Sequence, residues 1–384
     1  MKSFLIASGL VLVTMVSGQD TALPVSRPVG TVELVASFDG PMPTGVTVSR
    51  KGRVFVNFPR WGDPVDFTVA EVKDGVATAF PAEMNRFDRG RPTETLVSVQ
   101  SVVVDAADRL WILDTGSVEF GPPVGAKLVG VELSTNEVFT TIPFPPSVVL
   151  PTTYLNDIRI DLRKSTAGVA YITDSSPNGP NAIIVVDLDT GKASRRLNNH
   201  RSTKADANFL PIVEGKPLME NRPGESASHL SIGSDGLALD QEGKYLYYCP
   251  LASRHLYRIP TDALLCEKSC EEKRCKSIED LGNRGFASDG LEADDRGRIY
   301  LTDYEHNSIL RRGTDGRYET LLHDPRVLWP DTMSVANDGY LYFIANQLHR
   351  QRNYQKGADL REKPYCLFRT KIDAGPVALA RDND

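Results

Sequence analysis

The sequence predicts an all-β protein, a six-bladed β-propeller with four antiparallel strands in each blade. Three observations favour this fold. A pattern of a short apolar strand, a polar turn and a longer aromatic-rich strand occurs six times. Matching positions of the six copies lie 56, 60, 76, 53 and 42 residues apart, and strand-only repeats near about 50 residues are typical of propeller blades. A further strand before the first copy can complete the last blade.

Each copy is expected to form a β-hairpin, because apolar and polar residues alternate along it and its turn is polar. The six hairpins are expected at 46–56, 102–113, 158–172, 237–248, 291–301 and 333–343. Two more strands follow the hairpins, as at 127–133 and 138–142. These strands complete blades of four.

The last blade needs a strand from elsewhere in the chain. After its hairpin the sequence offers one more strand, 366–372, and the apolar stretch 31–38 can supply the fourth. Closure of the ring by this N-terminal strand removes the sheet edges that would otherwise invite aggregation. We therefore expect a single propeller domain over 28–373, preceded by a short segment, 19–27, and followed by a C-terminal tail, 374–384.

Residues 1–18 are typical of a signal peptide. Lys2 supplies the positive charge, 4–16 is almost wholly apolar, and 16–18 offers small residues for cleavage. The apolar run is shorter than the ~20 residues that span a bilayer as a helix. We expect a protein of the secretory pathway or a secreted protein, a monomer with no membrane partner.

The composition is that of an ordinary globular protein. The 384 residues include 44 Lys and Arg against 50 Asp and Glu, a formal net charge of −6. This balance disfavours a basic surface for nucleic acid. Serine-hydrolase, zincin and nucleotide-cofactor motifs are absent from the sequence. We expect a small-molecule substrate or ligand and no organic cofactor.

The five cysteines predict a disulfide. Cys266, Cys270 and Cys275 stand together in a charged insertion, Cys249 lies in an apolar strand, and Cys366 is near the C-terminus. One or two disulfides drawn from the cluster and Cys366 fit an oxidising compartment, although the sequence leaves the pairing open.

A polar residue stands at one equivalent position of all six blades, two residues before the first apolar residue of the inner strand. The six are Thr44, Gln100, Asn156, Asp235, Asp289 and Asp331. Inner strands line the central channel of a propeller, so these side chains predict a site there. The alternatives are turn caps, polar contacts to an organic ligand, or a divalent metal, for which Ca²⁺ suits an all-oxygen ring.

Aromatic residues occur near these positions and predict an apolar wall for the same site. Trp329, Tyr304 and Trp61 lie close to them in the sequence, as does His229. Aromatic walls with a few convergent polar groups are typical of a small-molecule pocket. Two long irregular stretches, 198–229 and 347–364, are expected to be either lids over the site or surface loops.

Several segments resemble the major royal jelly protein/yellow family and look like its fungal branch. These segments are 57–62, 109–116, 155–161, 170–176 and 247–253. The resemblance implies a six-bladed propeller. It leaves the activity open, because the family includes nutritive secreted proteins, amine binders, proteins linked to pigmentation, and fungal enzymes tied to hetero-Diels–Alder coupling of a quinone methide to an alkene.

A more distant similarity connects the chain to gluconolactonase and regucalcin propellers, which hold a divalent metal through a Glu, an Asn and an Asp. Asn156 and Asp235 resemble the last two ligands. The first-blade Glu has no counterpart, although Asp39 is a possible substitute. This departure puts metal-dependent lactonase chemistry in doubt.

Three functions follow as hypotheses. The first is an enzyme of fungal-type secondary metabolism that acts on a small apolar quinonoid, polyketide or terpenoid substrate, most specifically by hetero-Diels–Alder-type cyclisation. In it Asn156, His229, Gln100 and Asp235 act as the catalytic residues, while the remaining ring residues and Trp329, Tyr304 and Trp61 bind substrate. The second is a non-catalytic binder of biogenic amines or other small aromatics. The third is a metal-dependent lactonase or isomerase that uses Asn156 and Asp235 as ligands.

Overall fold

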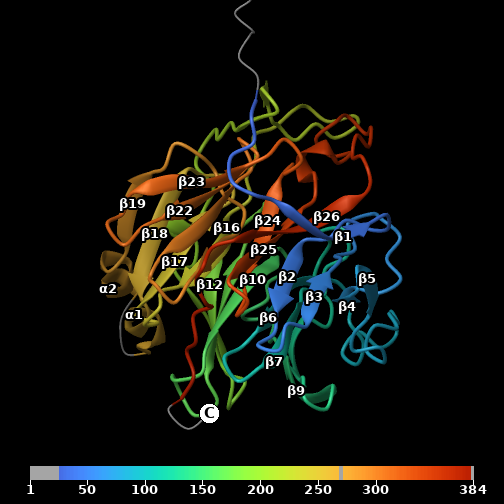
Figure 1. Cartoon of the computed structure of the whole chain (residues 1–384). Helices are drawn as coiled ribbons and strands as arrows, with labels where there is room; N and C mark the ends of the chain where they lie inside the picture. The colour runs from blue at the N-terminus through green and yellow to red at the C-terminus, as the bar shows by residue number, and fades with distance from the viewer. Residues whose placement is uncertain (1–25, 268–270, 382–384) are drawn as a thin grey trace, which may run out of the picture.

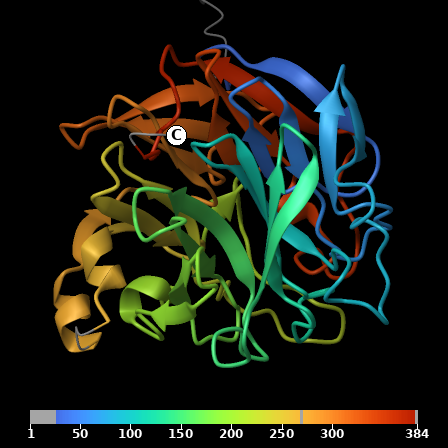
Figure 2. The ribbon, with the colours of Figure 1, turned by 90° about the horizontal axis from the view of Figure 1, so that it is seen from below.

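The structure, a computed structural model, describes residues 26–267 and 271–381. In this part of the chain six four-stranded antiparallel sheets surround a central axis (Figures 1 and 2). The predicted six-bladed β-propeller is therefore confirmed. The proposed signal peptide, 1–18, lies outside the described residues.

The first three blades follow one another along the chain, each running from the axis outward. Their strands are β2 (Gly45–Val48), β3 (Val54–Asn57), β4 (Val69–Lys73) and β5 (Val76–Ala79); β6 (Val99–Val104), β7 (Arg109–Asp114), β8 (Lys127–Glu132) and β9 (Glu137–Pro143); and β10 (Leu155–Asp161), β11 (Val169–Asp174), β12 (Ala182–Asp187) and β13 (Ala193–Arg196).

The last three blades contain the closing strand. Their strands are β16 (Ser234–Leu239), β17 (Tyr245–Pro250), β18 (His255–Pro260) and β19 (Glu279–Asn283); β20 (Leu291–Ala293), β21 (Ile299–Asp303), β22 (Ser308–Arg312) and β23 (Tyr318–His323); and β24 (Pro330–Val335), β25 (Tyr340–Ala345), β26 (Tyr365–Lys371) and β1 (Glu33–Phe38).

The inner strands form the wall of the channel. Each contacts the inner strand of the next blade, and β2 contacts β24 to close the ring. Strands β2, β16 and β24 are buried along their whole length. Because both faces of these strands are buried, their sequences are mostly apolar, with a few polar residues that face the axis or bond the neighbouring strands.

The N-terminal strand closes the ring as predicted. β1 pairs antiparallel with β26, from Glu33 opposite Arg369 to Phe38 opposite Tyr365. The pairing is reinforced by an ion pair in which Arg369 Nε lies 2.9 Å from Glu33 Oε2. The Phe38 ring packs edge-on against Phe58, whose ring centroid is 5.5 Å away. Because Phe58 follows the second strand of blade one, this contact also joins the last blade to the first.

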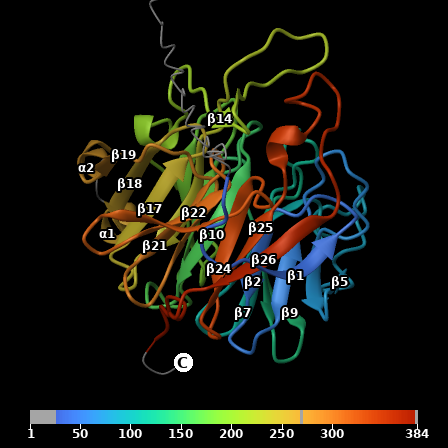
Figure 3. The same cartoon turned by 45° about the horizontal axis from the view of Figure 1, so that its top comes forward.

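Insertions between strands carry additional short elements. One carries η1 (Arg201–Thr203) and the small hairpin of β14 (Ile212–Val213) and β15 (Lys216–Pro217), and another carries η2 (Leu348–Arg350). Both stand at one end of the axis, at the top of Figures 1 and 3. Two short helices, α1 (Thr261–Leu265) and α2 (Glu271–Lys276), lie beside blade four. Among the described residues no helix has the length and apolar character needed to cross a bilayer.

The predicted disulfide is wrong for the cysteines that the structure describes. Cys249, Cys266, Cys275 and Cys366 are all free. Cys275 packs at the edge of the blade-four core, whereas Cys366 packs at the edge of the blade-six core, so the fold holds these two apart. Cys270 lies outside the described residues.

Replacing Phe38 with alanine should destabilise the whole propeller. Phe38 is only 6% exposed, so we expect a loss of about 3–5 kcal/mol in the free energy of unfolding, measured by urea denaturation. Leu34→Ala is the matched control, because Leu34 is on the same strand but 59% exposed; its effect should stay below about 0.5 kcal/mol. Equal effects of the two substitutions would mean that closure does not depend on this contact.

Candidate functional site

The predicted polar ring lies where the inner strands begin. In blades two, three, four and six the pairing of the inner strand is interrupted at this position, between Val99 and Ser101, Leu155 and Ile158, Ser234 and Leu237, and Pro330 and Met333. A β-bulge leaves a residue out of the ladder and redirects its side chain. The bulges therefore let a polar side chain point into the channel while the rest of the strand keeps its pairing.

A cavity of about 60 Å³ lies at this end of the axis; we call it the upper pocket. Five ring residues line it: Gln100, Asn156, Asp235, Asp289 and Asp331. Trp61, also predicted from the sequence, lines it as well. The structure thus brings together six of the ten predicted site residues, whose chemical roles stay predictions.

Thr44, the sixth ring residue, is buried and holds the backbone rather than lining the pocket. Its Oγ1 donates a hydrogen bond to the carbonyl oxygen of Gln100 at 3.3 Å and accepts one from Asn57 Nδ2 at 2.8 Å. Asn57 Nδ2 also donates to the carbonyl oxygens of Val99 and Gln100. These bonds fix the bulge that presents the Gln100 side chain.

Trp329 and Tyr304 lie behind the wall of the upper pocket, not among its lining residues. Trp329 is fully buried and donates from Nε1 to Asp289 Oδ2 at 2.6 Å. The Tyr304 ring stacks on it with centroids 4.1 Å apart. Through Trp329 this aromatic stack orients a carboxyl group of the pocket.

His229 lies away from the upper pocket. It lines a separate surface hollow, where its Nδ1 is 3.1 Å from the carbonyl oxygen of Phe209. The insertion turns earlier residues, Glu220 and Arg222, toward the pocket in its place. Spacing along the sequence could not show which part of this long loop turns inward.

Sequence reasoning missed three aromatic residues of the pocket. Phe120, Tyr154 and Tyr354 line it together with Trp61. The Phe120 ring stacks on Trp61 at 5.0 Å and packs against Tyr154 at 4.8 Å. Tyr154 directly precedes the inner strand β10, which is a signal the sequence offers; Phe120 and Tyr354 come from irregular loops, which carry none.

A hydrogen-bond chain orients one side of the pocket. Trp61 Nε1 donates to Tyr154 Oη at 2.7 Å, and Tyr154 Oη donates to Gln100 Oε1 at 3.1 Å. The Gln100 amide nitrogen is thereby turned away from Tyr154. Within residues 26–267 and 271–381 no hydrogen bond is recorded from this nitrogen or from the Asn156 side-chain amide. Both amides are available to a ligand.

Four aspartates, which we call the acid cluster, are buried together on the axis: Asp157, Asp235, Asp289 and Asp331. Burial, reinforced by the neighbouring carboxyls, raises the pKa of Asp235 and Asp331 well above the usual range. Burial also raises the pKa of Asp289 to about 7 and that of Asp157 to about 6. Burial therefore favours the neutral forms of Asp235 and Asp331, which can donate hydrogen bonds.

Hydrogen bonds orient the carboxyl groups of the acid cluster. Asp289 Oδ2 accepts from Trp329 Nε1 at 2.6 Å. Asp331 Oδ2 accepts from Asn346 Nδ2 at 2.6 Å. By contrast, two other buried acids, at the ends of strands β7 and β11, are ion-paired. Asp114 lies 2.7 Å from Lys127 Nζ, and Asp174 lies 2.8 Å from Arg195 Nη2.

The residues fit a three-ligand metal site poorly. Asn156 and Asp235 both line the upper pocket, but Asp39, the possible substitute for the missing glutamate, is exposed on the surface. In the described part of the chain no three His, Cys, Asp or Glu side chains are grouped so as to hold a metal ion.

The two irregular stretches cover the upper pocket. Residues 220 and 222 of one and 348, 351, 353 and 354 of the other contribute to its lining. The stretches are tied together, because Asn221 N donates to the carbonyl oxygen of Asn353 at 2.7 Å and Glu214 Oε2 lies 2.7 Å from His349 Nε2. The sequence left open whether these stretches are lids or surface loops. The structure places both of them over the upper pocket.

The chain is similar to known proteins over most of its length. Residues 97–374 match the family model described as "Major royal jelly protein". Major royal jelly protein 7 of Apis mellifera is 26% identical over 283 residues, 67% of this chain and 61% of the bee protein. The yellow-related salivary protein LJM111 of Lutzomyia longipalpis is 25% identical over 350 residues, 83% of this chain and 82% of that protein. The match thus spans about three-fifths of the bee protein's length.

Solved structures share the fold. Regucalcin from Agrobacterium tumefaciens has a TM-score of 0.52 at 12% identity, covering 90% of this chain and 96% of its own. A luciferin-regenerating enzyme has a TM-score of 0.54 at 13% identity, and the match covers 92% of this chain and 98% of that enzyme. At such identity the likeness concerns architecture alone.

The acid cluster should make stability depend on pH. A carboxyl whose pKa is raised by folding keeps its proton in the native state, so the unfolded state gains from deprotonation as pH rises above about 4. Stability should therefore fall between about pH 4 and 7, by up to about 1.4 kcal/mol per pH unit for each such group. Asp289→Asn should flatten this dependence in urea titrations, whereas Asp315→Asn, at an exposed turn of the same blade, should not. Parallel profiles for both variants would show that Asp289 is ionised in the folded protein.

Proposed function

The chain belongs to the major royal jelly protein family, and from this premise we propose that its upper pocket binds a small, largely apolar molecule with a carbonyl group and promotes its cyclisation. The observation that carries the proposal is the set of buried carboxyl groups, whose neutral forms are favoured by burial, beside an aromatic wall. A neutral carboxylic acid can donate a hydrogen bond to an oxygen on which negative charge develops, as in other enzymes that keep such an acid buried. The most specific reaction we propose is a hetero-Diels–Alder-type coupling of a quinone methide to an alkene.

Such a reaction requires only that the protein position the reactants and donate hydrogen bonds. Holding two reactants in a reactive geometry removes much of the entropic barrier, and donors aimed at a carbonyl oxygen stabilise the charge that develops there. In this proposal Asn156, Gln100 and a protonated Asp289 supply the donors. Trp61, Phe120 and Tyr154 hold the apolar partner. His229 has no part, because it lies in another hollow.

Entry of a substrate requires the covering loops to separate. At about 60 Å³ the upper pocket has room for only about four or five water molecules. The contacts between 214–222 and 348–356 are polar and near the surface. They are of the kind that opens locally at modest cost.

A second candidate, the binding of an amine without turnover, has its own supporting observation. Three aspartates of the acid cluster and Glu220 line the same small space, and among the residues that line the pocket only Arg222 is cationic. An organic cation would allow these acids to ionise and could stack on the aromatic wall through cation–π contacts.

We further propose that the protein is secreted. Its relatives are named for royal jelly and saliva, both secretions. The relatives named above are insect proteins, so membership of the fungal branch and a role in secondary metabolism stay predictions.

Cyclisation should slow as pH rises. Deprotonation of Asp289 removes a donor, so the enantiomeric excess and rate of product formed from a quinone-methide precursor and an alkene should fall above about pH 7. Asp289→Asn keeps a donor and should flatten the profile, whereas Asp289→Leu should reduce the rate about 10²–10³-fold. A racemic product with the spontaneous rate, in a folded protein, contradicts the proposal.

Amine binding should show the opposite dependence on pH. Calorimetric titration with phenethylamine should give affinities that rise from pH 5 to 8, because the amine stays protonated while the carboxyl groups ionise. The neutral analogue 2-phenylethanol is the matched ligand. Trp61→Ala should weaken binding about 2- to 30-fold, and Phe139→Ala, on the outer face of blade two, should leave it unchanged. No saturable binding at any pH would dismiss this candidate.

A further inference from the structure

A second pocket lies at the opposite end of the channel. The upper pocket is lined by residues at the start of the inner strands, whereas this one is lined by residues near their other ends, such as Val104, Ile160 and Leu239. We call it the lower pocket. Its volume is about 230 Å³, larger than the upper pocket and slightly below the ~300 Å³ at which pockets for drug-sized ligands begin.

The chain's own tail helps to form the lower pocket. Residues 375–379 line it together with the inner strands. This stretch is held in place because Leu162 N donates to the carbonyl oxygen of Leu379 and Asp295 N donates to that of Gly375. Val46, Val102 and Met333 make the opposite wall apolar, whereas Thr47, Ser49 and Asn337 add polar groups elsewhere in the lining.

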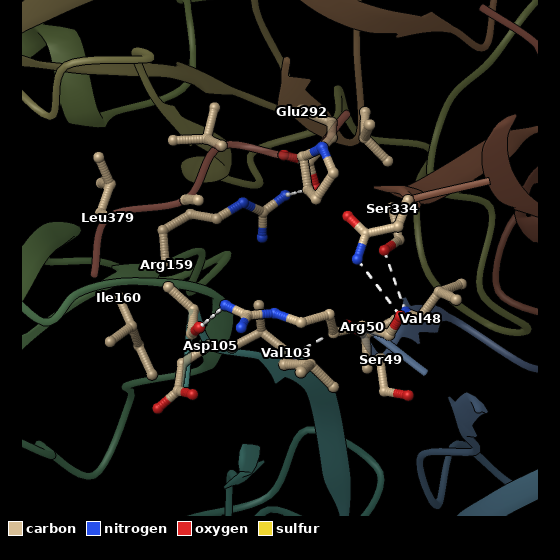
Figure 4. A pocket seen from close by; sticks show the side chains of 18 of the residues that line it. Val48, Ser49, Arg50, Val103, Asp105, Arg159, Ile160, Glu292, Ser334 and Leu379 are labelled. Atoms are coloured by element: carbon tan, nitrogen blue, oxygen red, sulfur yellow. Dashed lines mark hydrogen bonds and ion pairs between the residues drawn. The ribbon is translucent and has the colours of Figure 1, made fainter. Parts of the chain in front are cut away.

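Two arginine side chains reach into the lower pocket from two sides (Figure 4). Arg159 comes from the inner strand β10 and Arg50 from the turn that follows β2. The Arg50 guanidinium donates to the carbonyl oxygen of Ala106, and among the described residues it has no carboxylate partner. Its charge is therefore not balanced by an ion pair.

Arg159 is buried and incompletely bonded. Its side chain is 9% exposed. The two terminal nitrogens donate to the carbonyl oxygens of Ile158 at 2.8 Å and Leu291 at 2.6 Å. Its Nε has no hydrogen-bond partner among residues 26–267 and 271–381. A buried cationic nitrogen without a partner is costly, and it indicates a missing acceptor.

The acids around the pocket do not supply that acceptor. Glu292 Oε2 is 3.4 Å from Arg159 Nη2, a weak contact, and burial raises the pKa of Glu292, which favours its neutral form. Asp105 is bound by Arg109 at 2.8 Å and by Trp111 Nε1. Asp295 is exposed at the rim. Two guanidinium groups thus share the pocket with three carboxyl groups, and of these Glu292 is the one in contact with Arg159, at 3.4 Å.

We propose that the lower pocket is a second ligand site, which binds a small organic carboxylate between Arg159 and Arg50 with its hydrocarbon part against the apolar walls. Guanidinium groups match the planar fork of a carboxylate and bind it through charge-assisted hydrogen bonds. The apolar part of the wall favours a ligand with an apolar body over a bare inorganic anion. The volume limits that body to about one ring or a short chain.

Three probes of equal shape and different charge test the proposal: benzoate, benzyl alcohol and benzylamine. Isothermal titration of the full chain should show saturable binding of benzoate, with benzyl alcohol at least about tenfold weaker because it cannot form the ion pairs. Benzylamine should not compete with benzoate. Benzoate binding no tighter than that of benzyl alcohol would overturn the proposal.

Variants locate the site. Arg50→Ala removes an exposed side chain and should weaken benzoate about tenfold or more, while Arg317→Ala, an exposed arginine on a turn of blade five, should have no effect. Arg159→Gln should abolish binding and Arg159→Lys should restore part of it. Since Arg159 also bonds two backbone carbonyls, circular dichroism is recorded for each variant, and Arg50→Ala decides the outcome if Arg159→Gln does not fold. Unchanged affinity in folded Arg50→Ala would also overturn the proposal.

Discussion

The structure depends on one constraint, the closure of the blade ring by pairing of β1 with β26. Six blades that meet around an axis leave one blade incomplete unless a strand from the other end of the chain joins it. Closure brings β2 against β24 and so completes the wall of inner strands. Both pockets on the axis exist only because this wall is continuous, since residues of blades one to six contribute to each side of the channel.

The upper pocket shows how closure shapes chemistry. The bulges at the start of the inner strands deliver carboxyl and amide groups from different blades to one small space. Loops above and apolar strands around them bury the carboxyl groups, which raises their pKa. Acids that would be ionised in water at neutral pH are thus shifted toward neutral forms, which can donate hydrogen bonds. The ion pair of Asp114 with Lys127 shows the contrasting arrangement, a buried acid that faces a cation.

The architecture could be predicted from the sequence because it repeats, and much of the upper pocket because its ring residues occupy one repeated position. Features outside the repeat were harder to predict. His229 and Trp329 stood near the ring in sequence, but a long insertion turned one outward and a left-handed residue, Trp329 with φ of 56°, set the other behind the wall. Phe120 and Tyr354 come from loops without periodicity. The buried Arg159 passed unnoticed because an arginine in a strand pattern normally faces solvent.

The pairing of β1 with β26 also fixes the order of events during synthesis. Glu33 and Arg369, which form an ion pair across these strands, are 336 residues apart in the chain. β1 therefore leaves the ribosome among the first ordered segments and finds its partner only after every other blade has been made. Contacts of such long range slow folding, and until they form both strands present unpaired edges. A nascent chain of this kind benefits from a chaperone that shields its first strand.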